Sequence, residues 1–398
     1  MIKMNNHNMI PIKNTLQIVS ELIGRKSVTP DDGGCIDYLS GKLTELGFVV
    51  TELEFSGIKN LWAVHNSNNA NLYDIKEQTL TFLGHVDVVP AGDIDKWNTP
   101  PFTPTIKGDT LYGRGAVDMK GGIAAMLNAC GNFIEENGNN YNGSIAWLIT
   151  ADEEGVADFG TKVVLEWLLQ QKVSINSCLI GEPASASNLG DQIKIGRRGS
   201  LNGFVQIHGM QGHVAYTNGQ DNIIHKILPI LSKLANLDLA KKDDYFPATE
   251  FHIVKVNADG GAVNIVPGDI EIAFNLRFSP KQDIVSYKQS VNDILAEFDH
   301  TIKWQLSANP FFSEPKELAE AAKQAIHSHT KLEAKYSTSG GTSDGRFFPE
   351  FYPKAEIIEL GPVNTSAHQV NEYTSIKELD ILSLVYQEVL QRFFSTKK

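Results

Sequence analysis

The sequence predicts an α/β protein. We expect a catalytic domain with a mixed, largely parallel sheet covered by helices, interrupted by an inserted α+β ferredoxin-like domain. In the first and last parts of the chain, short apolar runs such as 79–84 and 144–150 alternate with helical segments, as expected for strands buried on both faces. Between them, apolar and polar residues alternate along the strands, which indicates a sheet with one exposed face. We place the catalytic domain at 1–198 and 310–398 and the inserted domain at 199–309.

Each element follows from its local pattern. Apolar residues at helical spacing, ended by glycine or proline, predict helices, and near-continuous apolar runs predict strands. In the catalytic domain these are a helical stretch at 15–46 broken at 25–34, strands at 48–54, 60–64 and 78–84, a helix at 119–137, a strand at 144–150, a helix at 161–171, a strand at 178–181, a helix at 317–330, a strand at 355–360 and a helix at 376–394. The inserted domain has the order β-α-β-β-α-β, with elements at 200–208, 223–237, 249–257, 269–278, 283–298 and 300–307.

Composition excludes several classes of protein. The 398 residues carry a net charge of −12, which argues against nucleic acid or an anionic membrane as a partner. The sequence lacks the roughly 18 consecutive apolar residues that a membrane span needs. Three cysteines without metal-type spacing favour a reducing, cytoplasmic location. Residues 1–13 are polar, so we expect a lead-in rather than a signal peptide.

Five residues of metal-binding type are scattered along the chain: His85, Asp118, Glu154, Glu182 and His368. The first four each follow a predicted strand, and ligands of open α/β sheets bind beyond the carboxyl ends of the strands. Two imidazoles and three carboxylates suit two divalent ions that share one carboxylate. This ligand set favours Zn²⁺, with Mn²⁺ or Co²⁺ as alternatives. A metal-dependent hydrolase is the function class that it indicates.

Two of these segments carry further chemistry. In His85-Val-Asp87, residues i and i+2 of an extended segment point the same way, so Asp87 can accept the second ring N–H of a metal-bound His85. Asp152-Glu153-Glu154 places three acids after an apolar strand, an arrangement that costs energy unless cations gather them. With Glu154 as a ligand, Glu153 is free to act as a general base on a water molecule.

Each of these residues also has a simpler interpretation. Asp118, between a glycine-rich turn and a helix, fits a helix N-cap. The acids at 152–154 fit a solvated loop, and Glu182 before Pro183 fits a turn. A His-x-Asp pair at a strand end is usually an exposed polar segment. In that case the chain binds one metal ion or none.

Several segments in combination resemble the di-zinc amidohydrolase family, which contains desuccinylases, deacetylases, aminoacylases, carboxypeptidases and tripeptidases. The resemblance spans nearly the whole chain. It is carried by 84–90 (GHVDVVP), 97–102, 111–121, 150–155 (TADEEG) and 181–183 (GEP). Within the family, four further segments resemble the desuccinylases: 189–200, 211–216, 339–346 and 359–368.

The resemblance implies a role for each ligand: His85 and Glu182 hold one zinc ion, Glu154 and His368 hold the other, and Asp118 bridges them. The cofactors are then two Zn²⁺ ions per chain, with Co²⁺ or Mn²⁺ as alternatives in the second site. The ligand that depends most on the resemblance is His368.

The resemblance further implies a water molecule between the metals that loses a proton to Glu153 and attacks the amide, while Asp87 orients His85. The inserted domain would form a homodimer, and His213 of a partner subunit would stabilise the oxyanion. The substrate site would be lined by Tyr216, Asn264, Arg277, Thr342 and Asn364.

The implied substrate is N-succinyl-LL-2,6-diaminopimelate, a small molecule of lysine biosynthesis with three carboxylates. Arg197, Arg198 and Arg277 are candidates for clamping them, because guanidinium groups bind carboxylates bidentately. Two departures from the family pattern bear on substrate preference: Gln369 stands where a basic residue is expected, and 66–78 is a long polar insert. The alternatives are an N-acetylornithine deacetylase, an aminoacylase, a di-zinc peptidase and a non-catalytic, metal-binding regulatory protein.

Overall fold

The computed structural model describes residues 14–66, 78–239 and 242–395. The predicted lead-in at 1–13 and most of the polar insert lie outside this part of the chain. The chain forms two compact units. Unit 1 comprises the chain up to Ile195, Ser313–Ser337 and the chain from Ser343 onward; unit 2 comprises Gly196–Phe312 and Thr338–Thr342.

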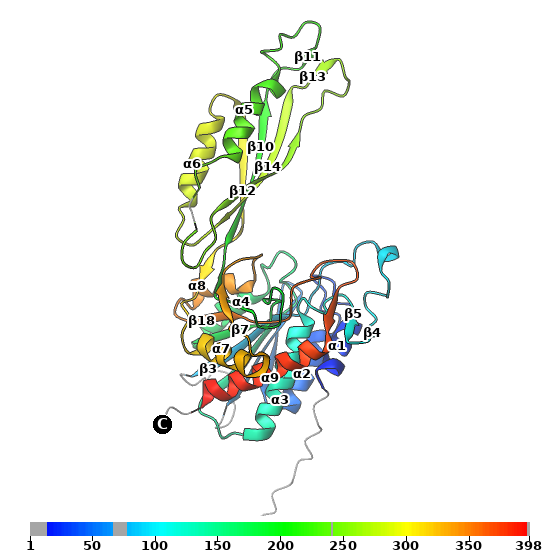
Figure 1. The fold of residues 1–398 in the computed structure, drawn as a ribbon, viewed down its shortest axis with the longest axis vertical. Helices are drawn as coiled ribbons and strands as arrows, with labels where there is room; N and C mark the ends of the chain where they lie inside the picture. Colours follow the sequence, from blue (N-terminus) through cyan, green and yellow to red (C-terminus); the bar gives the residue numbers. More distant parts are fainter. Residues whose placement is uncertain (1–13, 67–77, 240–241, 396–398) are drawn as a thin grey trace, which may run out of the picture. The chain divides into compact units, whose positions relative to one another are not determined.

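Unit 1 is built on one mixed sheet (Figure 1). The middle strands pair in parallel, and antiparallel pairs lie on both sides of them. All residues of the third and sixth strands are buried, so both faces of the sheet are covered, as predicted. The order across the sheet is β1 (Val49–Phe55), β2 (Ile58–Asn66), β6 (Ser144–Thr150), β3 (Thr79–His85), β7 (Ser177–Ile180), β18 (Glu356–Glu359), β8 (Gln192–Lys194) and β17 (Lys335–Ser337).

Helices cover this sheet. The third and ninth helices pack against each other, the first packs against the third, and the seventh packs against the ninth and against β18. Their apolar sides form one core with the sheet, which includes Phe82, Trp147 and Tyr386. The helices are α1 (Thr15–Gly24), α2 (Cys35–Glu45), α3 (Lys120–Asn137), α4 (Thr161–Gln170), α7 (Glu317–Thr330), α8 (Phe348–Phe351) and α9 (Ile376–Phe394). The α/β class and the break between the first two helices are confirmed.

A small antiparallel sheet was not predicted. It consists of β4 (Thr105–Lys107), β5 (Thr110–Tyr112) and β19 (Tyr373–Ser375). Its strands of three residues are too short to give a periodic pattern. The sheet joins two segments that lie far apart in the sequence, since Tyr112 is in register with Tyr373.

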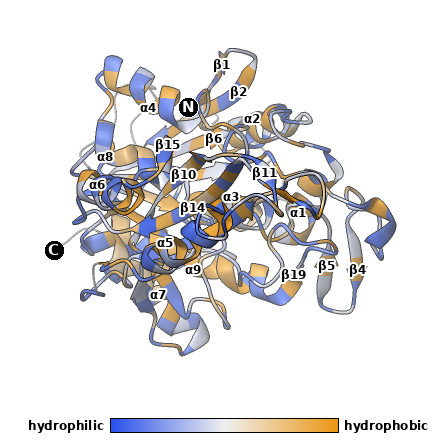
Figure 2. Ribbon diagram, turned by 90° about the horizontal axis from the view of Figure 1, so that it is seen from above, coloured by the Kyte–Doolittle hydropathy of each residue, from blue (hydrophilic) through white to orange (hydrophobic). Residues whose placement is uncertain are grey.

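Unit 2 has the predicted β-α-β-β-α-β order. Its four-stranded antiparallel sheet has the order β12 (Glu250–Asn257), β14 (Asp269–Phe278), β10 (Gly199–His208) and β15 (Asp299–Ala308), and its helices are α5 (Ile223–Ala235) and α6 (Ile284–Leu295). Hydrophobic and hydrophilic residues alternate along α5 (Figure 2), and its buried side is formed by Ile223, Ile227, Ile230 and Leu234. Short pairs add β11 (Gly212–His213) with β13 (Ile265–Val266), and β9 (Gly196–Arg197) with β16 (Phe311–Phe312).

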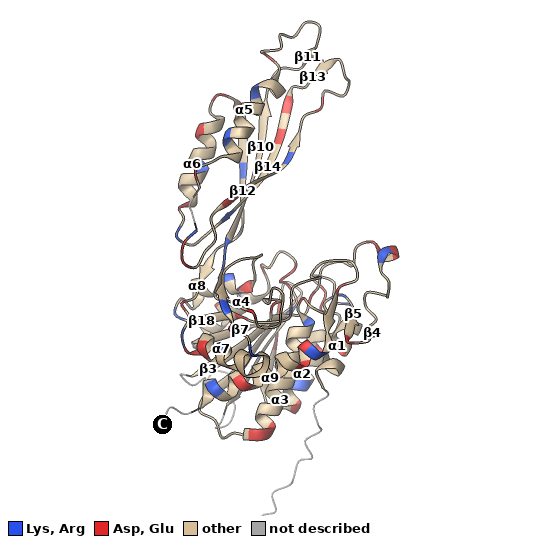
Figure 3. Ribbon diagram, viewed as in Figure 1, with Lys and Arg blue, Asp and Glu red and all other residues tan. Residues whose placement is uncertain are grey.

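Charge is distributed over both units. Lys and Arg share α6, α7 and α9 with Asp and Glu (Figure 3), so the acidic surplus is spread along the chain. Among the described residues, we find no helix with both the length and the apolar character needed to cross a membrane.

One close backbone approach links α3 to the end of β7. A Cβ atom added at Gly122 would lie 2.1 Å from the carbonyl oxygen of Gly181, the residue before Glu182. Backbone cannot yield as a flexible side chain does, so the α3 helix can lie this close only with glycine at this position.

We therefore expect Gly122→Ala to lower the free energy of unfolding by about 1–3 kcal/mol, as overpacking does in other cores. Gly41→Ala is the matched control. Gly41 also lies in a helix, but an added Cβ would have no neighbour within 4 Å. Its replacement should leave stability unchanged or raise it by up to about 1 kcal/mol. Urea denaturation measures both variants, and equal stability for the two would contradict the assigned role of Gly122.

Candidate active site

Three neighbouring strands bring three of the predicted ligands together. The strands β6, β3 and β7 are adjacent and parallel, so their carboxyl ends meet at one edge of the sheet. His85 is the last residue of β3, Glu154 lies four residues beyond β6, and Glu182 lies two residues beyond β7. This is the arrangement expected at the carboxyl edge of an open α/β sheet.

Asp118 does not follow a strand of this sheet. The expectation that it does was wrong. It lies six residues beyond β5, which belongs to the small antiparallel sheet, and it directly precedes Met119 at the start of α3. It is not the helix cap either, because the N-cap residue of α3 is Met119 and makes no side-chain capping bond. The peptide bond between the two is cis.

The carboxylate of Asp118 lies between the two imidazoles. Its Oδ1 lies 3.3 Å from Nε2 of His85, and its Oδ2 lies 3.3 Å from Nε2 of His368. On the first side, Nε2 of His85 is also 3.5 Å from Oε1 of Glu182. On the second side, Nε2 of His368 lies 2.8 Å from Oε1 of Glu154. The five residues thus form two groups of candidate ligands that share one carboxylate.

The chemistry of these atoms fits metal ions. Nε2 of His85 and Oδ1 of Asp118 are buried and have no hydrogen-bond partner among the residues that the structure describes. Orphaned buried polar atoms are rare and call for an explanation. His85, Asp118 and Glu154 place ligand atoms within 4.8 Å of one another, as do His85, Glu153 and Glu182. Nitrogen and oxygen donors at such spacing suit a divalent cation.

Asp87 acts on two parts of the site. Nδ1 of His85 lies 2.9 Å from the backbone carbonyl oxygen of Asp87 and 3.5 Å from its carboxylate, so the shorter contact is to the backbone rather than to the expected carboxylate. The carboxylate instead accepts the backbone N–H groups of Glu153, at 3.2 Å, and Glu154, at 3.0 Å. Asp87 therefore ties the end of β3 to the acidic loop after β6.

The acidic loop contains one acid with a structural role and two acids that face the site. Asp152 is buried and accepts backbone N–H groups from Ala157 and Phe159, which closes its own loop. A loop acid is thus a good description of Asp152. Glu153 and Glu154 belong instead to the groups of candidate ligands around His85.

The pKa values of the imidazoles and of the carboxylates are raised by different causes. Burial opposes the charged form of His85, but Asp118, Asp87 and Glu182 raise its pKa well above the ordinary value. Asp118 and Glu154 raise the pKa of His368 to about 10. Burial and the charge of Asp118 raise the pKa of Glu182 to about 7.

Glu153 is the carboxylate most affected by its surroundings. Burial raises its pKa well above the usual range, although His85 acts in the opposite direction. Perturbed pKa values of this kind cluster at functional sites. Such a group has the increased proton affinity that a base needs near neutral pH.

Two site residues were not singled out from the sequence. Nη1 of Arg346 lies 3.7 Å from Oε1 of Glu153, and Nη2 of Arg346 lies 3.4 Å from Oδ1 of Asp344. Asp344 is buried, and neither of its carboxylate oxygens has a hydrogen-bond partner in the described part of the chain. Both residues lie in the segment 339–346. The run of glycine, serine and charged residues in this segment is the sequence feature that could have indicated them.

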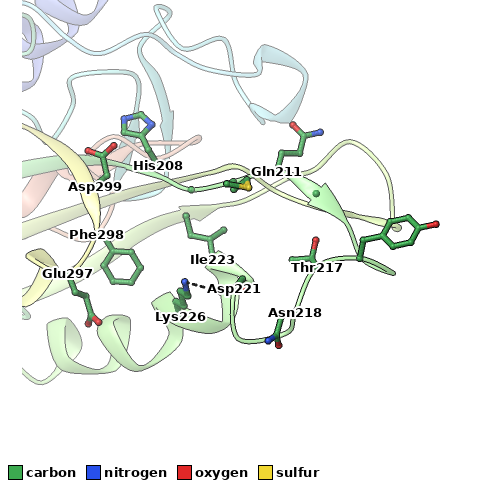
Figure 4. A pocket seen from close by; sticks show the side chains of 14 residues that line it. His208, Gln211, Thr217, Asn218, Asp221, Ile223, Lys226, Glu297, Phe298 and Asp299 are labelled. Atoms are coloured by element: carbon green, nitrogen blue, oxygen red, sulfur yellow. Dashed lines mark ion pairs between the residues drawn. The ribbon is translucent and has the colours of Figure 1, made fainter.

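His213, Tyr216 and Asn264 belong to unit 2. Nδ2 of Asn264 lies 3.4 Å from Nε2 of His213, and both side chains are exposed. Tyr216 is 91% exposed. It lies at a cavity of about 640 Å³ whose lining includes His208, Gln211, Lys226 and Asp299 (Figure 4).

The three arginines differ in their contacts. Arg197 is buried and donates to the backbone oxygen of Ser339 at 3.1 Å. Arg198 pairs with Glu250 at 2.8 Å. Arg277 is half-buried on β14, and its guanidinium makes neither a hydrogen bond nor an ion pair within the described part of the chain. Of the two remaining predicted residues, Thr342 belongs to unit 2, and its hydroxyl has no hydrogen-bond partner among the described residues, whereas Asn364 is an exposed residue of unit 1.

An open α/β sheet with paired imidazoles and shared carboxylates at its carboxyl edge is typical of a metal-dependent hydrolase. The model of Peptidase family M20/M25/M40 matches residues 81–392, and the chain belongs to this family. It is 43% identical over 383 residues to succinyl-diaminopimelate desuccinylase of Thioalkalivibrio sulfidiphilus, covering 96% of this chain and 99% of the relative. It is also 43% identical over 379 residues to the enzyme of the same name from Hahella chejuensis, covering 95% of this chain and 96% of the relative.

Solved structures share the fold. A metallo-carboxypeptidase of the M20 family from Sulfolobus solfataricus matches with a TM-score of 0.77 and 18% identity, over 96% of this chain and 99% of that chain. A dinuclear metal-binding peptidase of the M20 family from Bacillus subtilis matches with a TM-score of 0.68 and 14% identity, over 94% of this chain and 96% of that chain. The expected family and fold class are confirmed.

Proposed function

We propose that this chain hydrolyses the succinyl amide of N-succinyl-LL-2,6-diaminopimelate in a metal-dependent reaction. The observation that carries the proposal is the carboxylate of Asp118, which presents one oxygen to His85 and the other to His368. The choice of substrate is supported by the curated relatives, which are 40–43% identical and carry the name of this desuccinylase. The near-complete coverage of those relatives supports the same reaction.

The geometry supports two cation sites. We call the set of His85, Glu182 and Asp118 the His85 site, and the set of Glu154, His368 and Asp118 the His368 site. Two Zn²⁺ ions suit these ligands, with Co²⁺ or Mn²⁺ as alternatives in the His368 site. When bound, divalent cations would polarise the amide carbonyl and lower the pKa of a water molecule.

Glu153 would move the proton. Its high pKa favours acceptance of a proton from the attacking water, and the same carboxyl group then donates that proton to the departing amine. Asp87 would hold Glu153 in place through the backbone N–H bond. Arg346, 3.7 Å from the carboxylate of Glu153, would restrict how far that side chain swings.

The roles of unit 2 are also proposals. His213 would donate a hydrogen bond from Nε2 to the oxyanion of a partner subunit's substrate, and Ala215 would orient the ring by donating its backbone N–H to Nδ1. A homodimer through unit 2 and a cytoplasmic location stay predictions from the sequence. Tyr216, Thr342 and Asn364 stay predicted substrate contacts.

The test of this function is a comparison of amides. We expect purified protein with added Zn²⁺ to hydrolyse N-succinyl-LL-diaminopimelate with a kcat/KM at least about 100-fold above that for N-acetylornithine, because a site that hydrogen-bonds a carboxylate rejects a substrate without it. Chelation should abolish turnover and Zn²⁺ should restore it. Faster hydrolysis of N-acetylornithine or of a dipeptide would assign the chain to a sibling activity. Hydrolysis of none of them by protein with two Zn²⁺ ions would indicate a non-catalytic binding protein.

Glu153→Ala tests the base. The variant should bind both metal ions but lose turnover by about 10²–10⁴-fold, the usual contribution of general acid–base catalysis. Metal content and kcat are measured on the same sample. Substantial residual kcat in a variant with full metal content would falsify the assignment.

Arg277→Lys tests the carboxylate clamp. Because the guanidinium of Arg277 makes no hydrogen bond or ion pair among the described residues, it is the most available of the three for a substrate carboxylate. Loss of about one charge-assisted hydrogen bond should raise KM roughly tenfold with little change in kcat. Arg392→Lys, an exposed arginine paired with Glu388, is the control and should leave KM unchanged. An unchanged KM in Arg277→Lys rejects the clamp.

A further inference from the structure

A buried ion pair lies next to the metal-ligand cluster but contributes no ligand. Nη1 of Arg114 lies 2.8 Å from Oε2 of Glu372, and the two side chains are 2% and 1% exposed. Arg114 precedes Asp118 by four residues, and Glu372 follows His368 by four residues. The pair therefore joins the two loops that carry these two ligands.

Glu372 holds the loop before Asp118 through its backbone. Its Oε2 accepts the N–H of Gly115 at 2.9 Å, and its Oε1 accepts the N–H groups of Val117 at 3.0 Å and Asp118 at 3.2 Å. One carboxylate thus fixes the main chain up to and including the shared ligand. Bonds from a charged acceptor to backbone N–H groups are among the stronger hydrogen bonds in proteins.

Arg114 holds the other loop. Besides Glu372, its Nη1 donates to the backbone oxygen of Gln369 at 3.1 Å, next to His368. Nη2 donates to the backbone oxygen of Pro90 at 3.2 Å, five residues beyond His85. His368 has φ of 62°, and Asn371 has φ of 63°. Residues held in this sparsely populated region persist only where the surroundings fix them.

We propose that Arg114 and Glu372 are positioning residues for the His368 site, and that their pairing fixes Asp118 relative to His368. This inference rests on the metal centre proposed above. The pair contacts the loops of both Asp118 and His368, two of the three ligands of the His368 site. The His85 site shares Asp118 with it, but its other two ligands, His85 and Glu182, are carried by β3 and by the segment directly after β7. Loss of the clamp should therefore weaken the His368 site more than the His85 site.

The decisive variant is Glu372→Asp, which keeps the negative charge but is too short to reach both Arg114 and the three N–H groups. Stepwise titration of metal-free protein with Zn²⁺ by calorimetry should show one of the two Zn²⁺ affinities reduced about 10- to 100-fold, the usual effect of losing a partner beyond the ligands. The other affinity should fall by a clearly smaller factor. Titration with Co²⁺, followed by visible absorption, should show an altered spectral change as the second ion binds. Arg114→Lys, which keeps the positive charge but loses the forked contacts, should give the same pattern.

Glu356→Gln is the control for a structural effect. Glu356 is also a buried carboxylate that accepts three backbone N–H groups, from Lys316, Leu318 and Ala319, but it caps α7. It should lower the melting temperature and leave both Zn²⁺ affinities unchanged. Wild-type affinity at both sites in folded Glu372→Asp and Arg114→Lys overturns the proposal, as does an equal loss at both sites. Wild-type protein that binds fewer than two Zn²⁺ ions overturns the metal centre itself.

Discussion

Repulsion among carboxylates is the constraint on which the rest of unit 1 depends. Asp118, Glu153, Glu154 and Glu182 crowd around two imidazoles at the carboxyl edge of the sheet. Removing such charges from water costs several kcal/mol each unless partners compensate. The raised pKa values of Glu153 and Glu182 express this cost, whereas the raised pKa of His368 reflects its pairing with Asp118 and Glu154. Divalent cations relieve it, so binding of the cations and stability of the site are linked.

A second set of carboxylates supports the first set and makes different contacts. Asp87, Asp152 and Glu372 accept backbone N–H groups, two or three each, from the loops that carry the ligands. Because backbone donors satisfy these three acids, each can be buried without a metal ion. The division explains how so acidic a region folds: some acids organise the loops, and others remain available to cations.

The sequence was sufficient for the architecture because buried strands and amphipathic helices give strong periodic patterns. It also predicted that His85, Glu154 and Glu182 lie at one edge of the sheet, because they lie at the ends of such strands or a few residues beyond them. It failed where no period exists. The strands of the small sheet span three residues each, so the sequence did not show that Asp118 follows a strand of this second sheet. Arg114, Glu372 and Asp344 escaped notice because their importance comes from contacts between residues far apart in the chain.

The two imidazoles show why the loops need this support. His85 is 2% exposed and ends a strand whose every residue is buried, so packing fixes its position. His368 is 52% exposed and lies in a loop with a left-handed backbone at two positions. Hydrogen bonds and an ion pair hold that loop. A metal centre with one ligand on a rigid strand and another on a loop is only as well ordered as the polar contacts that hold the loop. Here those contacts include the pair of Arg114 with Glu372, the bonds between Ser366 and Tyr373, and those of Asn371 with Asn98 and Lys96.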